Sequence, residues 1–317
     1  MKAIICGISG QDGGYLAKFL LDKGYEVLGT SRDASTSDFK NLEYLGIREQ
    51  VSITSMNLYD FGSVMDIVRS FNPDEIFNLA GQSSVGLSFQ QPLDTMESIS
   101  RASLILLEVI RILNLPIRFY NAGSSECFGN TFGIPANEET IFKPRSPYGV
   151  AKASSYWLVR NYREAYGIFA STGILFNHES PLRSDRFVTQ KIVKSALKIK
   201  KGELNSLKVG NIFISRDWGW APDYVEAIWL MMQENTPSDF VIATGKSNTL
   251  KSFIDKTFDY YNLDWQKYVQ VDEELFRPSD IMDSVGDPKL ARTKLNWQAK
   301  VNFDELIIKM CSGDSNK

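Results

Sequence analysis

Residues 2–27, KAIICGISGQDGGYLAKFLLDKGYEV, decide the fold of this chain. The apolar run at 2–6 ends in glycines, which is typical of a buried strand that enters a tight turn. Apolar residues then recur with helical spacing, Gly24 ends that pattern, and YEVLGTS begins a second strand. This order predicts a βαβ unit at the start of the chain.

The same alternation continues through the N-terminal half. Further strands are expected at 51–56, 75–80, 117–123 and 170–176, and helices at about 61–71, 94–113 and 148–166. Regular strand–helix alternation predicts an α/β fold, a Rossmann-type doubly wound parallel sheet.

Beyond about residue 180 the rhythm changes. A basic helical stretch, 187–201, precedes the strand-like LKVGN and the aromatic RDWGWAPDYVEAIWLMM. This predicts a smaller C-terminal α/β lobe. We expect residues 1–180 to bind the cofactor and carry the catalytic residues. Residues 181–317 should mainly bind substrate, with some segments returning to the first domain.

Composition excludes several classes of protein. The net charge is −3 and Lys and Arg are scattered, which argues against a nucleic-acid-binding surface. No apolar run approaches the roughly 18 residues of a membrane span, and the N-terminus lacks the pattern of a signal peptide. Three widely spaced cysteines indicate reduced thiols and a cytoplasmic protein. With His178 as the single histidine, we expect neither a multi-histidine metal site nor a histidine-based triad.

Gly7, Gly10 and Gly13 form a G-x-x-G-x-x-G pattern between the first strand and the first helix. Glycines there let the backbone approach a pyrophosphate, whose charge meets the N–H groups of the helix N-terminus. The position within a βαβ unit therefore predicts a dinucleotide site. Arg32, at the end of the second strand, favours NADP over NAD because a guanidinium suits a 2′-phosphate. Asp33, the next residue, weakens the preference for NADP. The alternative for Arg32 is that it is only a solvated surface charge.

Tyr148 and Lys152, in SPYGVAK, lie at i and i+4 near the start of a predicted helix. A nearby ammonium and a positively charged cofactor ring would lower the pKa of the phenol, which could then take a proton from a sugar hydroxyl. An ordinary surface pair is the alternative. In NAGSSECFG, Ser124 and Glu126 follow a strand, at the edge where open α/β sheets bind ligands. A simple turn is the alternative there.

Together these motifs resemble the extended short-chain dehydrogenase/reductases, and most closely the GDP-mannose 4,6-dehydratases. The matching stretches are GISGQDGGYLAKFLLDKGYEV, NLAGQSSVGLSFQQP, SPYGVAK, YREAYGIFASTGILFNHESP, RDWGWAPDYVEAIWLM, DFVIATG and RPSDI. FNHESP and RDWG are far more specific than the short motifs.

The resemblance implies an internal redox reaction. Tyr148 would take the C4 hydroxyl proton while hydride passes to NADP, with Ser124 at the reacting oxygen. Glu126 would take the C5 proton and expel the C6 hydroxyl as water, and the hydride would return to C6. The expected catalytic residues are Ser124, Glu126, Tyr148 and Lys152.

The resemblance also implies the residues that bind each ligand. For the cofactor these are Gly7, Gly10, Gln11, Asp12, Gly13, Arg32, Asn57, Leu58, Leu79, Ala80, Tyr148, Lys152 and His178. For the GDP-sugar they are Ser83, Ser125, Asn177, Val188, Lys191, Arg216, Arg277 and Asp280. Asn177 and Arg216 are expected at the diphosphate, Val188 and Lys191 near guanine. The alternative for Lys191 is that it is only a solvated surface charge. The alternative for the tryptophans near Arg216 is that they pack the lobe and do not contact the sugar.

Several positions depart from the family pattern. Ser84 and Trp220 replace histidines, Asn57 an aspartate, Leu182 and Asp33 arginines, Asp280 a glutamate, and Gly123 a small polar residue. An insertion expected before RPSDI is absent. These changes leave open another GDP-sugar, such as an N-acetylhexosamine or a heptose, and a homodimer where the family often forms homotetramers.

Three function classes are compatible with the sequence. The leading one is a GDP-hexose 4,6-dehydratase, a lyase. A 4-keto reductase or epimerase on the same fold would need Ser124, Tyr148 and Lys152 but not Glu126. A catalytically silent, nucleotide-sensing protein is the third, and the complete catalytic set argues against it.

Overall fold

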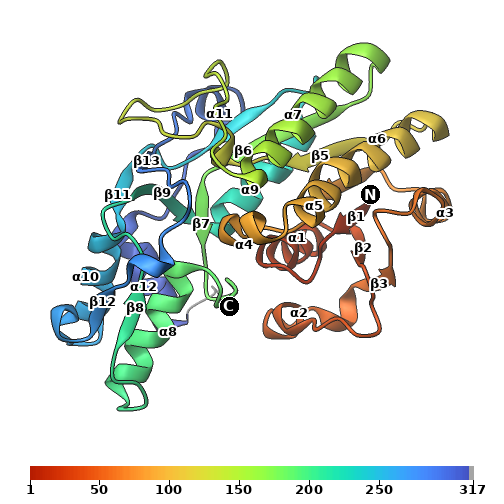
Figure 1. Ribbon diagram of the computed structural model, residues 1–317. Helices are drawn as coiled ribbons and strands as arrows, with labels where there is room; N and C mark the ends of the chain where they lie inside the picture. The colour runs from red at the N-terminus through yellow and green to blue at the C-terminus, as the bar shows by residue number, and fades with distance from the viewer. Residues whose placement is uncertain (314–317) are drawn as a thin grey trace.

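A seven-stranded sheet, parallel at every pairing, forms the centre of the computed structural model, which describes residues 1–313 (Figure 1). Its strands are β1 (Lys2–Cys6), β2 (Glu26–Ser31), β3 (Ser52–Ser55), β4 (Glu75–Asn78), β5 (Arg118–Ala122), β6 (Ala170–Leu175) and β10 (Phe240–Ile242). They lie in the order β10-β6-β5-β4-β1-β2-β3. The chain reverses its direction of winding between β1 and β4, which is the switch point where such sheets bind ligands. The predicted Rossmann-type sheet is confirmed.

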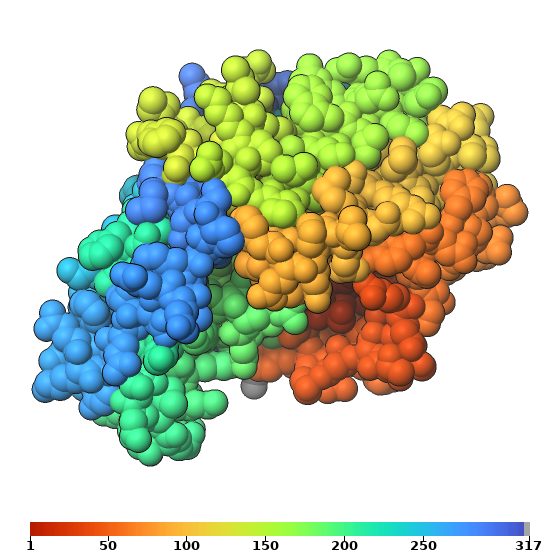
Figure 2. Space-filling view, in the orientation of Figure 1, coloured from red at the N-terminus to blue at the C-terminus, as the bar shows by residue number. Residues whose placement is uncertain are grey.

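The second lobe is built on strands outside this sheet. It contains β7 (Asn177–Glu179), β8 (Leu207–Val209), β9 (Ser215–Trp220), β11 (Ser247–Thr249), β12 (Val269–Val271), β13 (Asp283–Ser284), α8 (Val188–Lys200), α10 (Leu250–Tyr260) and α12 (Phe303–Ser312). β9 pairs with β7, β11 and β13. Figure 2 shows this lobe, green to blue, beside the N-terminal body, with the surface hollowed where the dark red, orange and green segments meet.

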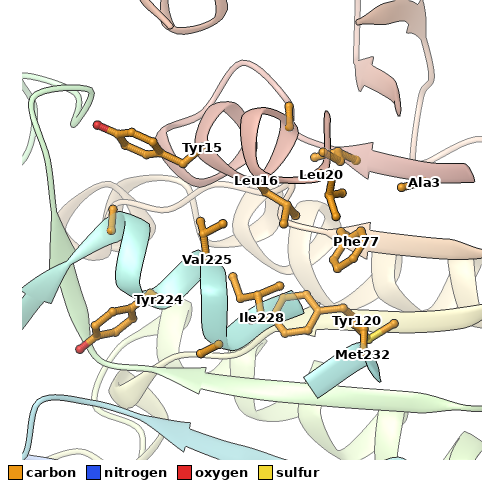
Figure 3. Close-up of a cluster of buried hydrophobic side chains, with 14 of the residues drawn as sticks. Ala3, Tyr15, Leu16, Leu20, Phe77, Tyr120, Tyr224, Val225, Ile228 and Met232 are labelled. Carbon is orange, nitrogen blue, oxygen red and sulfur yellow. The ribbon is translucent and has the colours of Figure 1, made fainter. Parts of the chain in front are cut away.

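Helices cover both faces of the main sheet. One face carries α1 (Gln11–Asp22), α2 (Lys40–Tyr44) and α9 (Ala221–Gln233), and the other carries α3 (Phe61–Phe71), α6 (Ala102–Leu113) and α7 (Pro147–Tyr166). Successive side chains of a strand point to opposite faces of the sheet, so neighbouring residues of one strand pack into different hydrophobic cores. Phe77 belongs to the α1/α9 core, whereas Ile76 belongs to the α3/α6/α7 core. Figure 3 shows side chains of α1 and α9 gathered around Phe77 and Tyr120.

The C-terminal half contributes to the first body as well. α9 packs against α1, β10 pairs with the outer edge of β6, and α11 (Lys289–Lys294) lies beside β10. Residues 221–242, which form α9 and β10, therefore belong to the body built on the main sheet. The boundary between the two domains at residue 180 stays a prediction.

The expected single helix at 94–113 is interrupted. It consists of α5 (Pro92–Met96), a π-helical turn (Glu97–Arg101) and α6. The Ser98 hydroxyl accepts a hydrogen bond from the backbone N–H of Gln82 at 3.2 Å and ties this turn to the segment after β4. A further short helix, α4 (Val85–Gln90), was not expected from the sequence. Ser84 caps its start, because the Ser84 hydroxyl accepts a hydrogen bond from the backbone N–H of Leu87. Across residues 1–313, no helix has both the length and the apolar character needed to span a bilayer.

Candidate active site

The glycine turn brings the start of α1 close to the end of β4. Gly7 has φ +84°, and a Cβ on it would lie 3.0 Å from Cα of Ala80. A Cβ on Gly13 would lie 2.4 Å from the backbone oxygen of Gly7, so neither Gly7 nor Gly13 has room for a side chain. Gly10 precedes α1 without a side-chain cap, and the first N–H groups of the helix remain available to an anion.

The first cavity, of about 580 Å³, opens above this turn. Ten predicted cofactor residues line it: Gly7, Gly10, Gln11, Asp12, Gly13, Arg32, Asn57, Leu58, Leu79 and Ala80. It lies at the carboxyl ends of β1, β2 and β4, beside the switch point. Glycines that admit no Cβ, an uncapped helix N-terminus and walls with both polar and apolar side chains fit a dinucleotide.

Arg32 and Asp33 differ in where their charges act. Arg32 lines the first cavity, and its guanidinium carbon lies 5.5 Å from the ring centroid of Tyr59. The carboxylate of Asp33 accepts hydrogen bonds from the backbone N–H and hydroxyl of Ser35, at 2.9 and 2.6 Å. Asp33 therefore closes its own turn and is not among the residues that line the cavity.

The second cavity, of about 350 Å³, contains the four predicted catalytic residues: Ser124, Glu126, Tyr148 and Lys152. His178 lines it too, together with the predicted substrate residues Ser83, Ser125, Asn177, Val188, Lys191, Arg216 and Arg277. Asp280 lines neither cavity; its carboxylate lies 3.9 Å from Nε of Arg277. Six residues border both cavities, so the two are joined: Asp12, Leu79, Ser83, Arg183, Arg186 and Phe187.

Tyr148 is positioned by the start of α7. The Ser146 hydroxyl caps the helix by accepting from the N–H of Gly149 at 3.0 Å, and Pro147 occupies the first turn. Burial raises the pKa of Tyr148 above its usual value, and a hydrogen bond with Ser124 opposes that rise. The protein alone therefore keeps this phenol protonated.

Lys152 is buried one turn further along α7. Its ammonium donates to the backbone oxygen of Ala122 at 2.7 Å and lies 5.7 Å from the ring centroid of Tyr148. Burial lowers the pKa of Lys152 to about 8. The ammonium thus joins α7 to the end of β5 and stands beside the phenol on which the predicted chemistry depends.

A partly buried ion pair connects the glycine turn to the segment after β6. Nε2 of His178 lies 2.9 Å from Oδ2 of Asp12, and Nδ1 donates to the backbone oxygen of Phe176 at 2.8 Å. Burial alone would lower the pKa of His178, but Asp12 outweighs it and the pKa is raised. Burial likewise opposes ionisation of Asp12, yet His178 brings the pKa of that carboxyl down to about 2. Since both ring nitrogens are engaged, His178 serves as a support rather than a base.

Arg216 is a buried cation with an unused donor. Its side chain is 4% exposed, and Nη1 donates to the backbone oxygen of Ile281 at 2.7 Å. Within residues 1–313, Nη2 has no hydrogen-bond partner. Burial lowers the pKa of Arg216, and nearby Glu126 opposes this. A buried, partly unsatisfied guanidinium at a cavity wall fits an anionic ligand such as a diphosphate.

Some residues of the site were missed from the sequence. Arg183, Arg186 and Phe187 lie in the loop between β7 and α8, and this loop borders both cavities. A loop has no periodicity, so the two arginines soon after HES were its only signal. Asp217 was missed as well; it is fully buried and accepts from the N–H groups of Thr244 and Gly245, which holds the segment after β10 against β9.

A doubly wound parallel sheet with a Ser–Tyr–Lys set in a cavity joined to a dinucleotide-shaped cavity defines an extended short-chain dehydrogenase/reductase. The family model described as GDP-mannose 4,6 dehydratase matches residues 4–310. The chain belongs to this family, as the resemblance had indicated.

Individual relatives agree with this assignment. GDP-mannose 4,6 dehydratase 1 of Arabidopsis thaliana is 44% identical over 98% of this chain and 89% of its own length. The human GDP-mannose 4,6 dehydratase is 42% identical over 98% of this chain and 91% of its own.

Solved structures with lower identity share the fold. The UDP-glucose 4-epimerase of Thermotoga maritima has a TM-score of 0.87 at 22% identity, and the two chains cover 99% and 98% of each other. The dTDP-glucose 4,6-dehydratase of Bacillus anthracis, in complex with NAD, has a TM-score of 0.85 at 15% identity, with 100% of this chain and 97% of that one covered.

Proposed function

We propose that this protein is an NADP-dependent GDP-sugar 4,6-dehydratase that converts GDP-mannose, or a related GDP-hexose, to the GDP-4-keto-6-deoxyhexose. The observation that carries the proposal is the meeting of Ser124, Tyr148, Lys152 and Glu126 in one cavity that opens into the dinucleotide-shaped one. The first three suit oxidation at C4, and the carboxylate supplies the acid–base group that elimination also requires.

When bound by the residues around the glycine turn, a nicotinamide dinucleotide would supply a reversible acceptor for the hydride that leaves C4 and reaches C6. Tyr148 takes the C4 hydroxyl proton, while Ser124 hydrogen-bonds the same oxygen. Because burial raises the pKa of Tyr148, the phenolate forms only with positive charge beside it, and Lys152 supplies part of that charge. Glu126 removes the C5 proton, made acidic by the C4 ketone, and protonates the departing C6 hydroxyl. Once the hydride has reached C6, one proton must be added at C5, and the proton that Tyr148 took from the C4 hydroxyl balances it through exchange with solvent. The products are water and a 4-keto-6-deoxy sugar.

Each of the two cavities would bind one ligand, the cofactor in the first and the sugar nucleotide in the second. Residues around the glycine turn would hold the pyrophosphate of the cofactor, and Arg216 with Arg277 would hold that of the sugar nucleotide. The orphaned Nη2 of Arg216 supports the latter assignment. Asp280 would act by orienting Arg277, since it borders neither cavity.

We favour NADP over NAD on the placement of two charges. Arg32 faces the cofactor cavity, whereas Asp33 is taken up by its own turn. A guanidinium without a competing carboxylate suits a 2′-phosphate.

The assembly and the compartment are also proposals. Trp157 and Val150 on α7 are 55% and 45% exposed, which supports a homodimer or homotetramer that covers this helix. A cytoplasmic location rests on the three free cysteines.

The direct test incubates the protein with a panel of GDP- and UDP-sugars and no added reductant. Mass spectrometry should detect loss of one water from a GDP-hexose, and in deuterated water the product should gain deuterium from solvent at C5. Failure with every GDP-sugar, together with NADPH consumption on a 4-keto sugar, would establish a reductase instead.

A further inference from the structure

The loop between β7 and α8, residues 180–187, forms part of the boundary between the two cavities. Three of its side chains, Arg183, Arg186 and Phe187, line both of them. If the proposed function holds, on which this inference rests, each cavity receives a diphosphate. Two anions on either side of a shared boundary repel each other unless positive charge stands between them.

The charged residues of this loop differ in how they are engaged. Nε of Arg183 lies 3.3 Å from the buried carboxylate of Glu179, and its guanidinium carbon lies 3.7 Å from the ring centroid of Phe187. Asp185 pairs with Lys194 of α8. An ion pair and a ring therefore hold Arg183 in place, although its buried Nε makes no hydrogen bond within residues 1–313. Asp185 is neutralised outside the cavities.

Arg186 is the exception. It is exposed and borders both cavities, and in the described part of the chain its side chain makes no hydrogen bond and no ion pair. The other charged residue common to both cavities, besides Arg183, is Asp12, which is already paired with His178. Among the described cations that border both cavities, Arg186 is thus the one that is exposed and held by no ion pair.

We propose that Arg186 is a bridging residue, which neutralises the diphosphate of the dinucleotide and that of the sugar nucleotide together and so couples the binding of the two ligands. A guanidinium suits this task because its donors point in several directions within one plane and can serve two phosphate groups at once. Bound sugar nucleotide would then help to retain the cofactor through the internal redox cycle.

Binding measurements without turnover test the bridge. The dissociation constant of GDP is measured by calorimetry on protein stripped of cofactor and on protein saturated with NADP+. UDP is measured in the same way, so that the test still works if the protein prefers uracil to guanine. In Arg186→Ala, GDP affinity should fall roughly three- to tenfold more in the saturated protein than in the stripped one. Arg186→Lys should recover part of the difference.

Lys198→Ala is the matched control, since Lys198 is an exposed cation of α8 that lines neither cavity. It should leave the ratio of the two dissociation constants unchanged. An equal loss of GDP affinity in both states, a loss confined to NADP+ binding, or no change in Arg186→Ala would each overturn the bridge. A wild-type protein that shows the coupling but never releases water from a GDP-sugar would refute the proposed function and leave the bridge standing.

Discussion

The backbone oxygen of Glu126 lies against Gly149 so closely that a Cβ on Gly149 would sit 2.8 Å from it. Gly149 directly follows Tyr148 in the first turn of α7, and Glu126 belongs to a short 3₁₀ turn, Ser125–Cys127. The phenol and the carboxylate of the proposed reaction therefore stand on two segments whose backbones touch. The close approach of these two segments depends on a glycine at position 149.

Gly149→Ala should force these two segments apart. The added methyl group would also approach Cβ of Pro144 to 3.1 Å, so the backbone must shift. We expect a loss of about 1–3 kcal/mol in the free energy of unfolding, typical of overpacking, and a fall in kcat of roughly tenfold or more from misplacement. Urea unfolding and steady-state assays would measure both. Gly62→Ala is the control, because its new Cβ meets nothing closer than 3.4 Å; equal effects in the two variants would contradict the explanation.

Glu126→Gln should separate oxidation from elimination. The amide cannot take the C5 proton, so water loss should fall by about 10²–10⁴-fold, whereas Ser124, Tyr148 and Lys152 still allow hydride transfer from C4. Rapid-mixing absorbance of the reduced cofactor should show it accumulate, while mass spectrometry detects no loss of water. A variant that still releases water at the wild-type rate would show that another group performs the elimination.

Arg32→Ala should change cofactor preference. Loss of the guanidinium removes a charged partner of the 2′-phosphate, so the ratio of NAD+ to NADP+ dissociation constants should fall by roughly 10–100-fold. Quenching of intrinsic tryptophan fluorescence would measure both constants. Asp33→Asn should leave the ratio nearly unchanged because that side chain serves its own turn. A ratio that responds to Asp33 and not to Arg32 would favour NAD.

Glu75 makes stability depend on pH. It is fully buried at the start of β4, and burial raises its pKa to about 7, despite hydrogen bonding from Gln233. The folded pKa exceeds the unfolded value of 4.5, so the folded state binds this proton more tightly. The resulting stabilisation is complete below pH 4.5 and is lost as the pH rises through about 7.

Glu75→Gln should remove that dependence. Relative to wild type, the variant should gain about 2–3 kcal/mol in the free energy of unfolding between pH 5 and pH 8. Urea titrations across this range would measure the difference. Glu139→Gln, at an exposed loop position, is the matched control and should run parallel to wild type. A constant offset between Glu75→Gln and wild type would show that the carboxyl does not titrate as described.

Much of the site was predictable because its residues stand at ends of regular elements. Gly7, Gly10 and Gly13 follow a strand, and Ser124 closely follows another, so sheet topology alone brings them to one edge. Tyr148 and Lys152 share a helix face by spacing. The family-derived residues then fell on the walls of the two cavities, with Asp280 as the exception.

What the sequence by itself determined is the βαβ start and the parallel sheet, because turn chemistry and apolar periodicity act over a few residues. The catalytic roles of Ser124, Glu126, Tyr148 and Lys152 stay predictions. The tertiary structure alone decided which distant segments meet: Asp12 pairs with His178, 166 positions away, and Arg186 stands between two cavities. The tertiary structure also decided that α9 and β10, from the C-terminal half, pack with the N-terminal sheet. These contacts depend on how whole layers pack, and packing leaves no local pattern along the chain.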